Sequence, residues 1–287
     1  LPCTGETNYS CNNTVNMTCD DSNAPNSYAL HDDASNITTY TSNNTNGYPH
    51  DVITESDTHF DTDKTATDVH YNTEQTYEYF LNEHGLDGFD NNHTHIRSWV
   101  HYRNNYVNAF WNGSWITYGD GNGTSYLPLT SLDIVAHEFG HAVTHHSASL
   151  VYAYESGALN ESFSDIFGTL LEFYAEPECA DWILDEDITI VPGKNGLRNM
   201  QNPNDGSMIT QQPDTYLGDF WYTGNGDNGG VHYNSGVLNY WFYLIANGGS
   251  GANDNGNTYN VAALDADLNE ARAKAADIAF RTLTVYL

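Results

Sequence analysis

Residues 131–149, "SLDIVAHEFGHAVTHHSAS", mark the point at which the pattern of the chain changes. Before them, short aromatic and β-branched runs are separated by turn signals such as "NTNGYP" and "YGDGNGTS", as expected of strands and loops. The stretch itself opens with Ser and Asp, which favour a helix N-terminus. Apolar residues then follow the helical period at Ile134, Val135, Phe139, Ala142 and Val143. We therefore predict a helix over residues 131–146.

Within this predicted helix, residues 137–141 read "HEFGH", an HExxH motif. On a helix, His137 and His141 point at one metal ion, and Glu138 lies beside a water bound to that ion. The alternative interpretation is a histidine-rich helix whose imidazoles are solvated and bind no metal, because such a helix could contain the same residues. A third ligand is needed to decide between these two interpretations.

His145 continues the spacing of four residues but does not fit as the third ligand. It starts about 12 Å from His137 along the axis, because a helix rises about 1.5 Å per residue. Zinc–nitrogen bonds of about 2.0 to 2.1 Å keep the ligand atoms of one ion about 3 to 4 Å apart. A longer HExxHxxGxxH motif is excluded, because Thr144 and Ser147 stand where it requires Gly and His. We expect His145 at the surface or around the ligands.

A carboxylate from the next predicted helix is the remaining candidate. The segment "ESGALNESFSDIFG" offers Glu161, at a distance in sequence that fits a loop followed by an antiparallel helix. Asp165 lies four residues on, on the same helix face, and is expected to accept the other ring N–H of a ligating histidine. The alternative is that Glu161 is an acidic residue favoured near a helix N-terminus by the helix dipole.

The rest of the chain divides into a β-rich half and a helical half. In the first half, residues 63–85 place Val, Thr, Tyr and Phe in helical register and end at a glycine. Residues 96–102, "IRSWVHY", suggest a second helical interruption, although we leave their assignment open. After the central helix, residues 160–176 and 234–249 read as helices, and residues 260–287 as one or two more.

The composition limits the classes of partner. The 287 residues contain 8 Lys and Arg against 38 Asp and Glu, a formal net charge of −30. Such a field repels phosphate backbones and anionic lipids, so we expect neither nucleic acid nor membrane as a partner. The charge serves either plain solubility or adaptation to salty surroundings, where counterions screen self-repulsion.

The chain has the features expected of an exported protein. It begins "LPCTGETNYS", without Met, basic or apolar leader segments, as expected of a processed mature chain. No apolar run approaches the roughly 20 residues needed to span a bilayer. Its four cysteines, Cys3, Cys11, Cys19 and Cys179, form no zinc-finger spacing and favour one or two disulfides, whose pairing the sequence leaves open. We expect a secreted monomer.

Several segments together resemble the thermolysin family of zinc metalloendopeptidases. They are "DIVAHEFGHAVT", "ESGALNESFSDIFGTLLEFY", "NAFWNGSWITYGDG", "LRNM" and "DNGGVHYNSG", between about residue 70 and residue 245. The resemblance implies an α+β fold with a β-rich N-terminal lobe over residues 1–130. The zinc-binding helix over residues 131–146 would follow, and then an α-helical lobe over residues 147–287, with the zinc cleft between the lobes. Members of the family continue further, so we expect this lobe to be short at its C-terminal end and to expose apolar surface.

The resemblance also implies roles for individual residues. The zinc ligands map to His137, His141 and Glu161, and the general base maps to Glu138. His232 and Tyr152 map to residues that stabilise the oxyanion of the tetrahedral intermediate, and Asp227 to the carboxylate that orients the histidine. Groups that bind the substrate backbone map to Asn108, the Ala109 carbonyl and Arg198.

Further positions concern specificity and calcium. The positions that line the family's pocket for the residue after the scissile bond are bulky and mostly apolar here: Tyr126, Leu129, Ile134, Leu184 and Leu197. They imply cleavage on the N-terminal side of residues such as Leu or Phe, although they would suit a plain core equally well. The family's calcium ligands map to Asp133, Glu172, Asp181 and Glu186. Ile183 stands where members with two calcium ions carry a carboxylate, so we expect one calcium ion, held also by the Ile183 carbonyl.

The leading hypothesis is therefore a secreted zinc endopeptidase that acts on peptides and proteins. One alternative is a protease-derived binding protein with weak or no catalysis. Another is a zinc hydrolase that acts on a different amide or ester. The groups that bind a peptide backbone favour the first hypothesis.

Overall fold

The structure is a computed structural model that describes residues 1–22 and 27–287. Its N-terminal half contains eleven of the named strands and one long helix. These are β1 (Pro2–Glu6), β2 (Thr14–Thr18), β3 (Asp20–Asp21), β4 (Tyr28–Ala29), β5 (His31–Asp32), β6 (Ile37–Thr41), β7 (Thr54–Glu55), β8 (His59–Phe60), α1 (Lys64–His84), β9 (Ile96–Val100), β10 (Ala109–Trp111) and β11 (Ile116–Tyr118).

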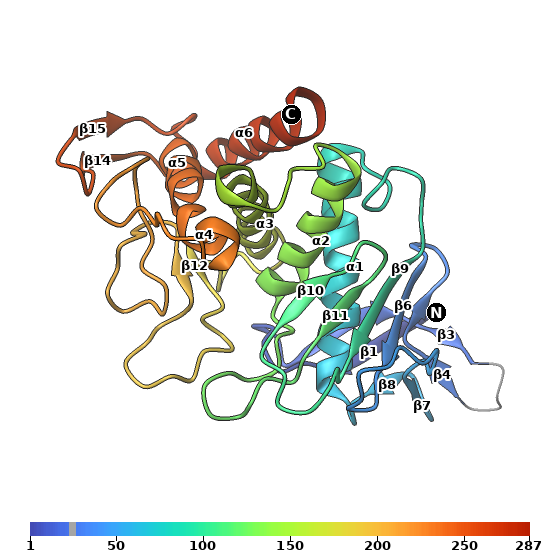
Figure 1. Cartoon of the computed structure of the whole chain (residues 1–287). Helices are drawn as coiled ribbons and strands as arrows, with labels where there is room; N and C mark the ends of the chain where they lie inside the picture. Colours follow the sequence, from blue (N-terminus) through green and yellow to red (C-terminus); the bar gives the residue numbers. More distant parts are fainter. Residues whose placement is uncertain (23–26) are drawn as a thin grey trace.

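The C-terminal half is mainly helical, with two short hairpins. Its elements are α2 (Leu132–His146), α3 (Tyr154–Ala175), β12 (Ile183–Leu184), β13 (Arg198–Asn199), α4 (Asp227–Asn234), α5 (Gly236–Asn247), β14 (Gly249–Ala252), β15 (Thr258–Val261), α6 (Leu268–Arg281) and a π-helical turn over Thr282–Tyr286. Figure 1 shows this order as a sheet on one side and the helices α2 to α6 on the other. The predicted fold class, a β-rich lobe followed by a helical lobe, is confirmed.

The main sheet has five strands in the order β10-β11-β9-β6-β5. β9 runs parallel to both β6 and β11, while the two outer strands pair antiparallel. β9 is the "IRSWV" segment, and the helical interruption suggested there is wrong: the segment is a strand, and its last three residues are all buried. Because both of its faces are covered, it lacks the alternation of apolar and polar residues that marks a half-buried strand. β10 lies at the edge of this sheet, next to the helical half.

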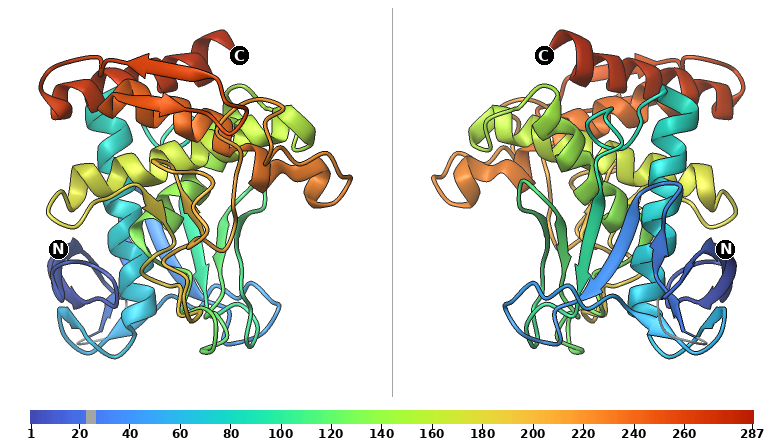
Figure 2. Two further views of the ribbon diagram at one scale, coloured as in Figure 1. Left: turned by 90° about the vertical axis from the view of Figure 1, so that its left-hand side faces the viewer. Right: turned by 90° about the vertical axis from the view of Figure 1, so that its right-hand side faces the viewer.

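Helix α1 packs between the sheet and the central helix α2 (Figures 1 and 2). Its N-terminus is capped by the Asp63 side chain, which accepts a hydrogen bond from Ala66 N at 3.0 Å. Its C-terminus is closed by Gly85, in the left-handed conformation with φ of 66°. The residues that the sequence placed in register are all buried, including Val69 and Phe80.

Helices α2 and α3 pack closely against each other, because a glycine lies on each side of their contact. A Cβ atom on Gly140, inside the HExxH motif, would approach Ser164 Cα to 3.0 Å. A Cβ atom on Gly168 of α3 would approach the Asp133 carbonyl oxygen to 2.7 Å. Glycine at both positions lets the backbones approach, and this brings α3 within ligand distance of the motif.

Two helix boundaries differ from the prediction. α3 begins at Tyr154, six residues before the expected start at Asn160. Conversely, the last helix, α6, begins only at Leu268, where the Asp267 side chain caps Asn269 N. The residues expected to open it pair instead as β15 in a hairpin with β14.

Two disulfides link the cysteines, Cys3 to Cys19 and Cys11 to Cys179. The second joins the N-terminal strands to the segment that follows α3. Among the described residues, no helix combines the length and apolarity that crossing a bilayer requires. At the end of the chain, α6 buries four of its five alanines, while Val285, Tyr286 and Leu287 are exposed.

Candidate active site

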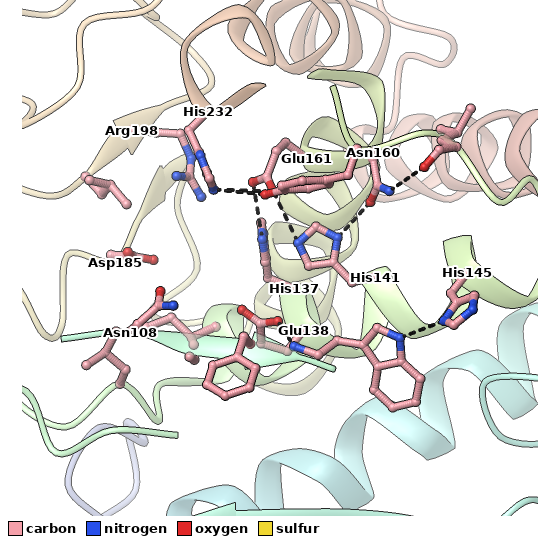
Figure 3. Close-up of a pocket in the computed structure, with 18 of the residues that line it drawn as sticks. Asn108, His137, Glu138, His141, His145, Asn160, Glu161, Asp185, Arg198 and His232 are labelled. Carbon is pink, nitrogen blue, oxygen red and sulfur yellow. Dashed lines mark hydrogen bonds and ion pairs between the residues drawn. The ribbon is translucent and has the colours of Figure 1, made fainter. Parts of the chain in front are cut away.

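A cleft of about 600 Å³ opens between the two halves of the molecule. It is bordered by β10, α2, α3 and the segments that carry Arg198 and His232, as Figure 3 shows. Glu138 and the two histidines of the HExxH motif lie on its floor. The cleft therefore brings together residues that are far apart in the sequence.

The three predicted zinc ligands lie at the separation that one ion requires. His137 Nε2 is 3.5 Å from Glu161 Oε2, and His141 Nε2 is 3.3 Å from Glu161 Oε1. The two imidazole rings are nearly perpendicular, with centroids 4.7 Å apart. Ligand atoms about 3 to 4 Å apart are what bonds of about 2 Å to a single zinc ion produce.

The setting of Glu161 fits a bound cation. The residue is fully buried, and its Oε2 atom has no hydrogen-bond donor among the described residues. Burial alone would raise the pKa of this carboxyl, but His141, His232 and His137 outweigh it and hold the pKa well below its ordinary value. A buried, ionised carboxylate with an unpartnered oxygen is costly unless a positive charge meets it. The residues present therefore fit zinc.

The far side of the His137 ring faces Asp165. His137 Nδ1 lies 2.9 Å from Asp165 Oδ1, which also accepts a hydrogen bond from Arg198 Nη2 at 2.7 Å. The other oxygen, Asp165 Oδ2, accepts from Asn239 Nδ2 at 2.8 Å. A carboxylate at this distance favours a proton on Nδ1, although the contact lies outside hydrogen-bond geometry, and Nε2 of the ring faces Glu161.

His141 is oriented in the same way by a residue that the sequence did not single out. Its Nδ1 atom lies 2.7 Å from Asn160 Oδ1, and Asn160 Nδ2 donates to the Leu150 carbonyl at 3.3 Å. Asn160 directly precedes Glu161, so its place next to the metal ligand was visible. Its contact with His141 depends on the crossing of α2 and α3, which no local pattern encodes. Burial alone would lower the pKa of His141, but Glu161 outweighs it and raises the pKa to about 9.

Glu138 lies beside these residues with its carboxylate in the cleft. It is almost fully buried, and Oε2 accepts a hydrogen bond from the backbone N–H of Trp111 at 2.8 Å. Trp111 belongs to the edge strand β10, which also carries Ala109 and follows Asn108. The predicted base and the predicted backbone-binding groups therefore line the same cleft.

His232, Asp227 and Tyr152 meet at the other side of Glu161. His232 Nδ1 lies 2.7 Å from Asp227 Oδ1, which leaves Nε2 pointing at Tyr152 Oη, 3.2 Å away. The Tyr152 hydroxyl also donates to Glu161. Helix α4 begins with a left-handed turn, and a Cβ atom on Gly229 there would meet the Tyr154 ring at 2.4 Å. Glycine thus lets the turn that carries His232 approach α3.

Arg198 lies in β13 and is almost fully buried, 5% exposed. Burial alone would lower the pKa of its guanidinium, but the charges of Asp165 and Asp185 outweigh it and raise the pKa. Its Nη2 atom is used by Asp165, while its Nε atom has no acceptor among the described residues. An unpartnered buried donor at a cleft wall is suited to an acceptor brought by a ligand.

The predicted specificity residues separate into two groups. Leu129, Ile134 and Leu197 line the cleft. Tyr126 and Leu184 do not line it in the described part of the chain, and Leu184 is a core residue, 1% exposed. Leu184 is turned inward because it pairs in the β12–β13 hairpin with its side chain against the core.

An acidic residue, Asp185, lines this end of the cleft instead. It adopts a left-handed backbone conformation, with φ of 63°. Burial, together with the charge of Asp133, raises the pKa of its carboxyl to about 8. We call the part of the cleft lined by Leu129, Ile134, Asp185 and Leu197 the specificity pocket. Sequence reasoning missed Asp185, because its direction depends on a loop conformation that composition does not encode.

A second acidic cluster lies behind this pocket. Carboxylate oxygens of Asp133, Glu172 and Glu186 lie within 4.8 Å of one another. Burial and the neighbouring carboxylates raise the pKa of Glu172 well above its ordinary value, and that of Glu186 to about 10. One oxygen of each of these two glutamates is buried without a hydrogen-bond partner among the described residues. The oxygen-only donor set suits calcium.

The two other predicted calcium ligands lie at the border of this cluster. Asp181 is outside the group of oxygens within 4.8 Å, and its Oδ1 atom accepts a hydrogen bond from Ile183 N at 2.6 Å. Burial and the charge of Asp133 raise the pKa of Asp181, so the carboxyl groups of Asp181 and Asp133 repel each other when both are ionised. Ile183 itself is half-buried in β12.

His145 lies apart from the three ligands, as the sequence predicted. It is exposed at the end of α2, and its Nδ1 atom accepts a hydrogen bond from the Trp111 indole at 3.1 Å. Figure 3 shows it on the side of the cleft opposite Asp185, away from His137 and Glu161. His146 stacks on Phe89.

Comparison with known proteins agrees with this geometry. The family profile "Thermolysin metallopeptidase, catalytic domain" matches residues 3–145, and "Thermolysin metallopeptidase, alpha-helical domain" matches residues 148–287. Bacillolysin of Brevibacillus brevis is 49% identical over 217 residues, which are 75% of this chain and 38% of that protein. Thermolysin of Alicyclobacillus acidocaldarius subsp. acidocaldarius is 45% identical over 229 residues, 77% of this chain and 40% of that protein.

A solved structure, the precursor of protealysin, a metalloproteinase from Serratia proteamaculans, aligns with a TM-score of 0.65 and 32% identity. The alignment covers 73% of this chain and 67% of that one. The chain spans about two fifths of the length of the curated relatives it matches. Two family profiles that together cover almost every residue, and a cleft that holds the HExxH residues beside Glu161, lead to one conclusion: the chain belongs to the thermolysin metallopeptidase family.

Proposed function

We propose that this protein is a secreted zinc endopeptidase and that its cleft hydrolyses peptide bonds. The observation that carries the proposal is the arrangement of His137, His141 and Glu161. Their ligand atoms converge, and the Glu161 Oε2 atom is buried without a donor among the described residues. The two disulfides support export, because such bonds persist in oxidising surroundings.

Zinc, when bound by these residues, supplies Lewis-acid chemistry that activates water and polarises a carbonyl group. Glu138 is the general base: its carboxylate accepts a proton from the attacking water and returns it to the leaving amine. The Trp111 N–H keeps that carboxylate turned into the cleft. Tyr152 and His232 donate hydrogen bonds to the negative charge that develops on the carbonyl oxygen. Asp227 keeps the His232 ring in the orientation that this role requires.

The substrate backbone is bound by Asn108, the Ala109 carbonyl and Arg198. All three residues line the cleft, and the unpartnered Arg198 Nε offers a donor for a substrate carbonyl. An extended peptide beside the edge strand β10 would satisfy these groups, since an edge strand presents unpaired backbone polar atoms. This arrangement favours a peptide over a small amide or ester. We propose three parts of the chain with different roles. Residues 1–130 form the β-rich lobe, residues 131–146 the zinc-binding helix, and residues 147–287 the helical lobe.

The residue after the scissile bond enters the specificity pocket. The pocket walls are formed by Leu129, Ile134 and Leu197, so we propose a preference for bulky apolar residues such as Leu or Phe. We also propose one structural calcium ion, held by Asp133, Glu172 and Glu186 together with Asp181 and the Ile183 carbonyl. Calcium would neutralise buried carboxylates that otherwise repel one another.

The test is cleavage of casein and of a furylacryloyl dipeptide amide by the protein and by its Glu138→Ala variant, each with and without a zinc chelator. We expect chelator-sensitive cleavage by the protein and a loss of at least about a hundredfold in the variant. Metal analysis should find about one zinc ion per chain. Cleavage that survives the chelator, or a fully active variant, would refute the mechanism. Zinc binding without cleavage would favour a non-catalytic binding protein.

A further inference from the structure

The carboxylate of Asp185 is a polar group inside an otherwise apolar pocket. Leu129, Ile134 and Leu197 supply hydrocarbon walls, while Asp185 supplies an acidic wall of the same cleft. No described residue donates a hydrogen bond to the Asp185 side chain, although its backbone is well bonded. A carboxylate in such a setting is expected to find a donor or a cation, and here the open side of the pocket is where one can enter.

The backbone of Asp185 fixes the direction of its side chain. Its N–H donates to Asp133 Oδ2 at 2.7 Å, and its carbonyl accepts from Thr189 Oγ1, also at 2.7 Å. The N–H group thus faces Asp133 of the acidic cluster, while the residue lines the cleft. Figure 3 shows Asp185 between Arg198 and Asn108, at the end of the cleft farthest from His145.

Two of the apolar residues that line the pocket come from segments that contact the backbone around Asp185. Ile134 directly follows Asp133, whose carboxylate holds the Asp185 backbone. Leu197 N donates to the Leu184 carbonyl at 2.8 Å, so Leu197 lies beside the residue that precedes Asp185. A side chain entering the specificity pocket therefore meets hydrocarbon walls and a carboxyl group in the same part of the cleft.

The guanidinium of Arg198 lies near the pocket but makes no ion pair with Asp185 in the described part of the chain. Arg198 is the only Lys or Arg among the described residues that line the cleft, and it pairs with Asp165 at 2.7 Å. Arg198 and Asp185 influence each other's pKa, but no ion pair or hydrogen bond joins the two side chains in the described part of the chain, so the Asp185 carboxyl group stays available to a ligand. When it is ionised, this carboxylate attracts a cation that enters the pocket.

We propose that Asp185 is a specificity-determining residue that lets the pocket accept lysine as well as apolar residues directly after the scissile bond. The four-carbon stem of lysine packs along Leu129, Ile134 and Leu197, and its ammonium group donates to the Asp185 carboxylate. A glutamate side chain in the same place is repelled. This inference rests on the proposed peptidase function and adds a second substrate class to it.

The test compares two peptides that differ only at the residue after the scissile bond, lysine in one and norleucine in the other. Both have the same stem length, so the ratio of their kcat/KM values isolates the ammonium group. Assays at pH 9 keep most carboxyl groups ionised and lysine charged. We expect Asp185→Asn to lower the lysine-to-norleucine ratio about tenfold, equivalent to 1.4 kcal/mol.

Asp187→Asn is the matched control. Asp187 is in the same loop, is exposed, and does not line the cleft in the described part of the chain. It removes the same charge, so the ratio should stay unchanged if contact rather than long-range charge is responsible. A second pair, glutamate and glutamine, needs no variant: the unmodified protein should cleave the glutamate peptide about tenfold more slowly.

The outcomes separate the two proposals. If norleucine is cleaved in a chelator-sensitive way but both variants keep the same lysine-to-norleucine ratio, the role of Asp185 is wrong and the peptidase function stands. If Asp185→Asn does not fold, equal cleavage of the glutamate and glutamine peptides overturns the inference on its own. If no peptide of the set is cleaved, the proposed function fails, and the inference fails with it.

Discussion

Replacing His101 by Asn should destabilise the protein by an amount that depends on pH. His101 is clamped between two carboxylates: Nε2 lies 2.9 Å from Asp63 Oδ2, and Nδ1 lies 2.9 Å from Asp120 Oδ1. Asp63 is the residue that caps helix α1, and Asp120 follows β11. The clamp therefore ties the start of the helix that supports α2 to the sheet that borders the cleft. Asn is suitable because His101 has a φ of 54°, a left-handed conformation that Asn tolerates.

The magnitude follows from the pKa of the imidazole. Burial alone would lower the pKa, but the hydrogen bonds that the ring donates to Asp120 and Asp63 outweigh burial and raise the pKa from 6.5 to about 10. This shift corresponds to about 5 kcal/mol as an upper bound, at about 1.4 kcal/mol per unit. The three side chains are 21%, 26% and 29% exposed, so we expect about 2 to 3 kcal/mol after screening by solvent.

The sign of the pH dependence is fixed by the same shift. Because the folded pKa of His101 is the higher one, its contribution is complete below pH 6.5 and is lost as the pH rises toward 10. Burial alone would raise the pKa of Asp63, but His101 outweighs burial and lowers it. The contribution of Asp63 to the free energy of unfolding is therefore lost as the pH falls below about 4. The clamp should stabilise most between about pH 4 and pH 6.5.

Urea unfolding of the protein and of His101→Asn, followed from pH 5 to pH 10, measures this effect. The difference in free energy of unfolding between the two should be about 2 to 3 kcal/mol at pH 6 and should approach zero near pH 10. Taking the difference cancels the titration of groups that both proteins share. A difference that is the same at both ends of the range would refute the reasoning.

Three further predictions concern packing, calcium and the disulfides. Gly140→Ala should lower the free energy of unfolding by about 1 to 3 kcal/mol, because the new methyl group meets Ser164 Cα at 3.0 Å; thermal unfolding measures it, and an unchanged Tm would contradict it. Saturating calcium, at about 100 times Kd, should stabilise the protein by about 2.7 kcal/mol, and Glu172→Gln should abolish most of this gain in calorimetry. Replacing Cys11 and Cys179 by Ser should cost about 3 to 5 kcal/mol, since their disulfide closes a loop with a sequence separation of 168; equal urea midpoints would exclude this.

Local periodicity was enough to predict α2 and α3, which carry the three proposed zinc ligands, but not α4, which carries His232. The central helix could be predicted because the HExxH residues and the apolar residues follow one helical period. Helix α1 could be predicted because its apolar residues are in helical register and a glycine ends it. The rejection of His145 as a ligand also followed from helix geometry alone, and the structure places it on the far side of Trp111. In each case, the property that mattered was contained within about 20 residues of chain.

Residues whose position depends on loop conformation or helix crossing could not be placed in this way. Asn160 reaches His141 only because two glycines let α2 and α3 approach. Asp185 faces the cleft only because its backbone is held in a left-handed conformation by Asp133 and Thr189. Leu184, one residue earlier, is turned into the core by the same hairpin. Adjacent residues thus have opposite environments for reasons that their sequence does not show.

The carboxyl group of Asp165 shows how these long-range contacts make one site from separate elements. This carboxyl group is fully buried. Its oxygens accept hydrogen bonds from Arg198 and Asn239, and Oδ1 lies beside Nδ1 of the His137 ring. Burial opposes its ionisation, yet Arg198 and His137 hold its pKa below the ordinary value. The carboxylate therefore contacts both His137, a proposed zinc ligand, and the guanidinium of Arg198, which we propose binds the substrate. In a chain with only 8 Lys and Arg, one arginine is buried against this carboxylate. That arginine therefore connects His137, through Asp165, to the wall of the cleft that carries Asp185.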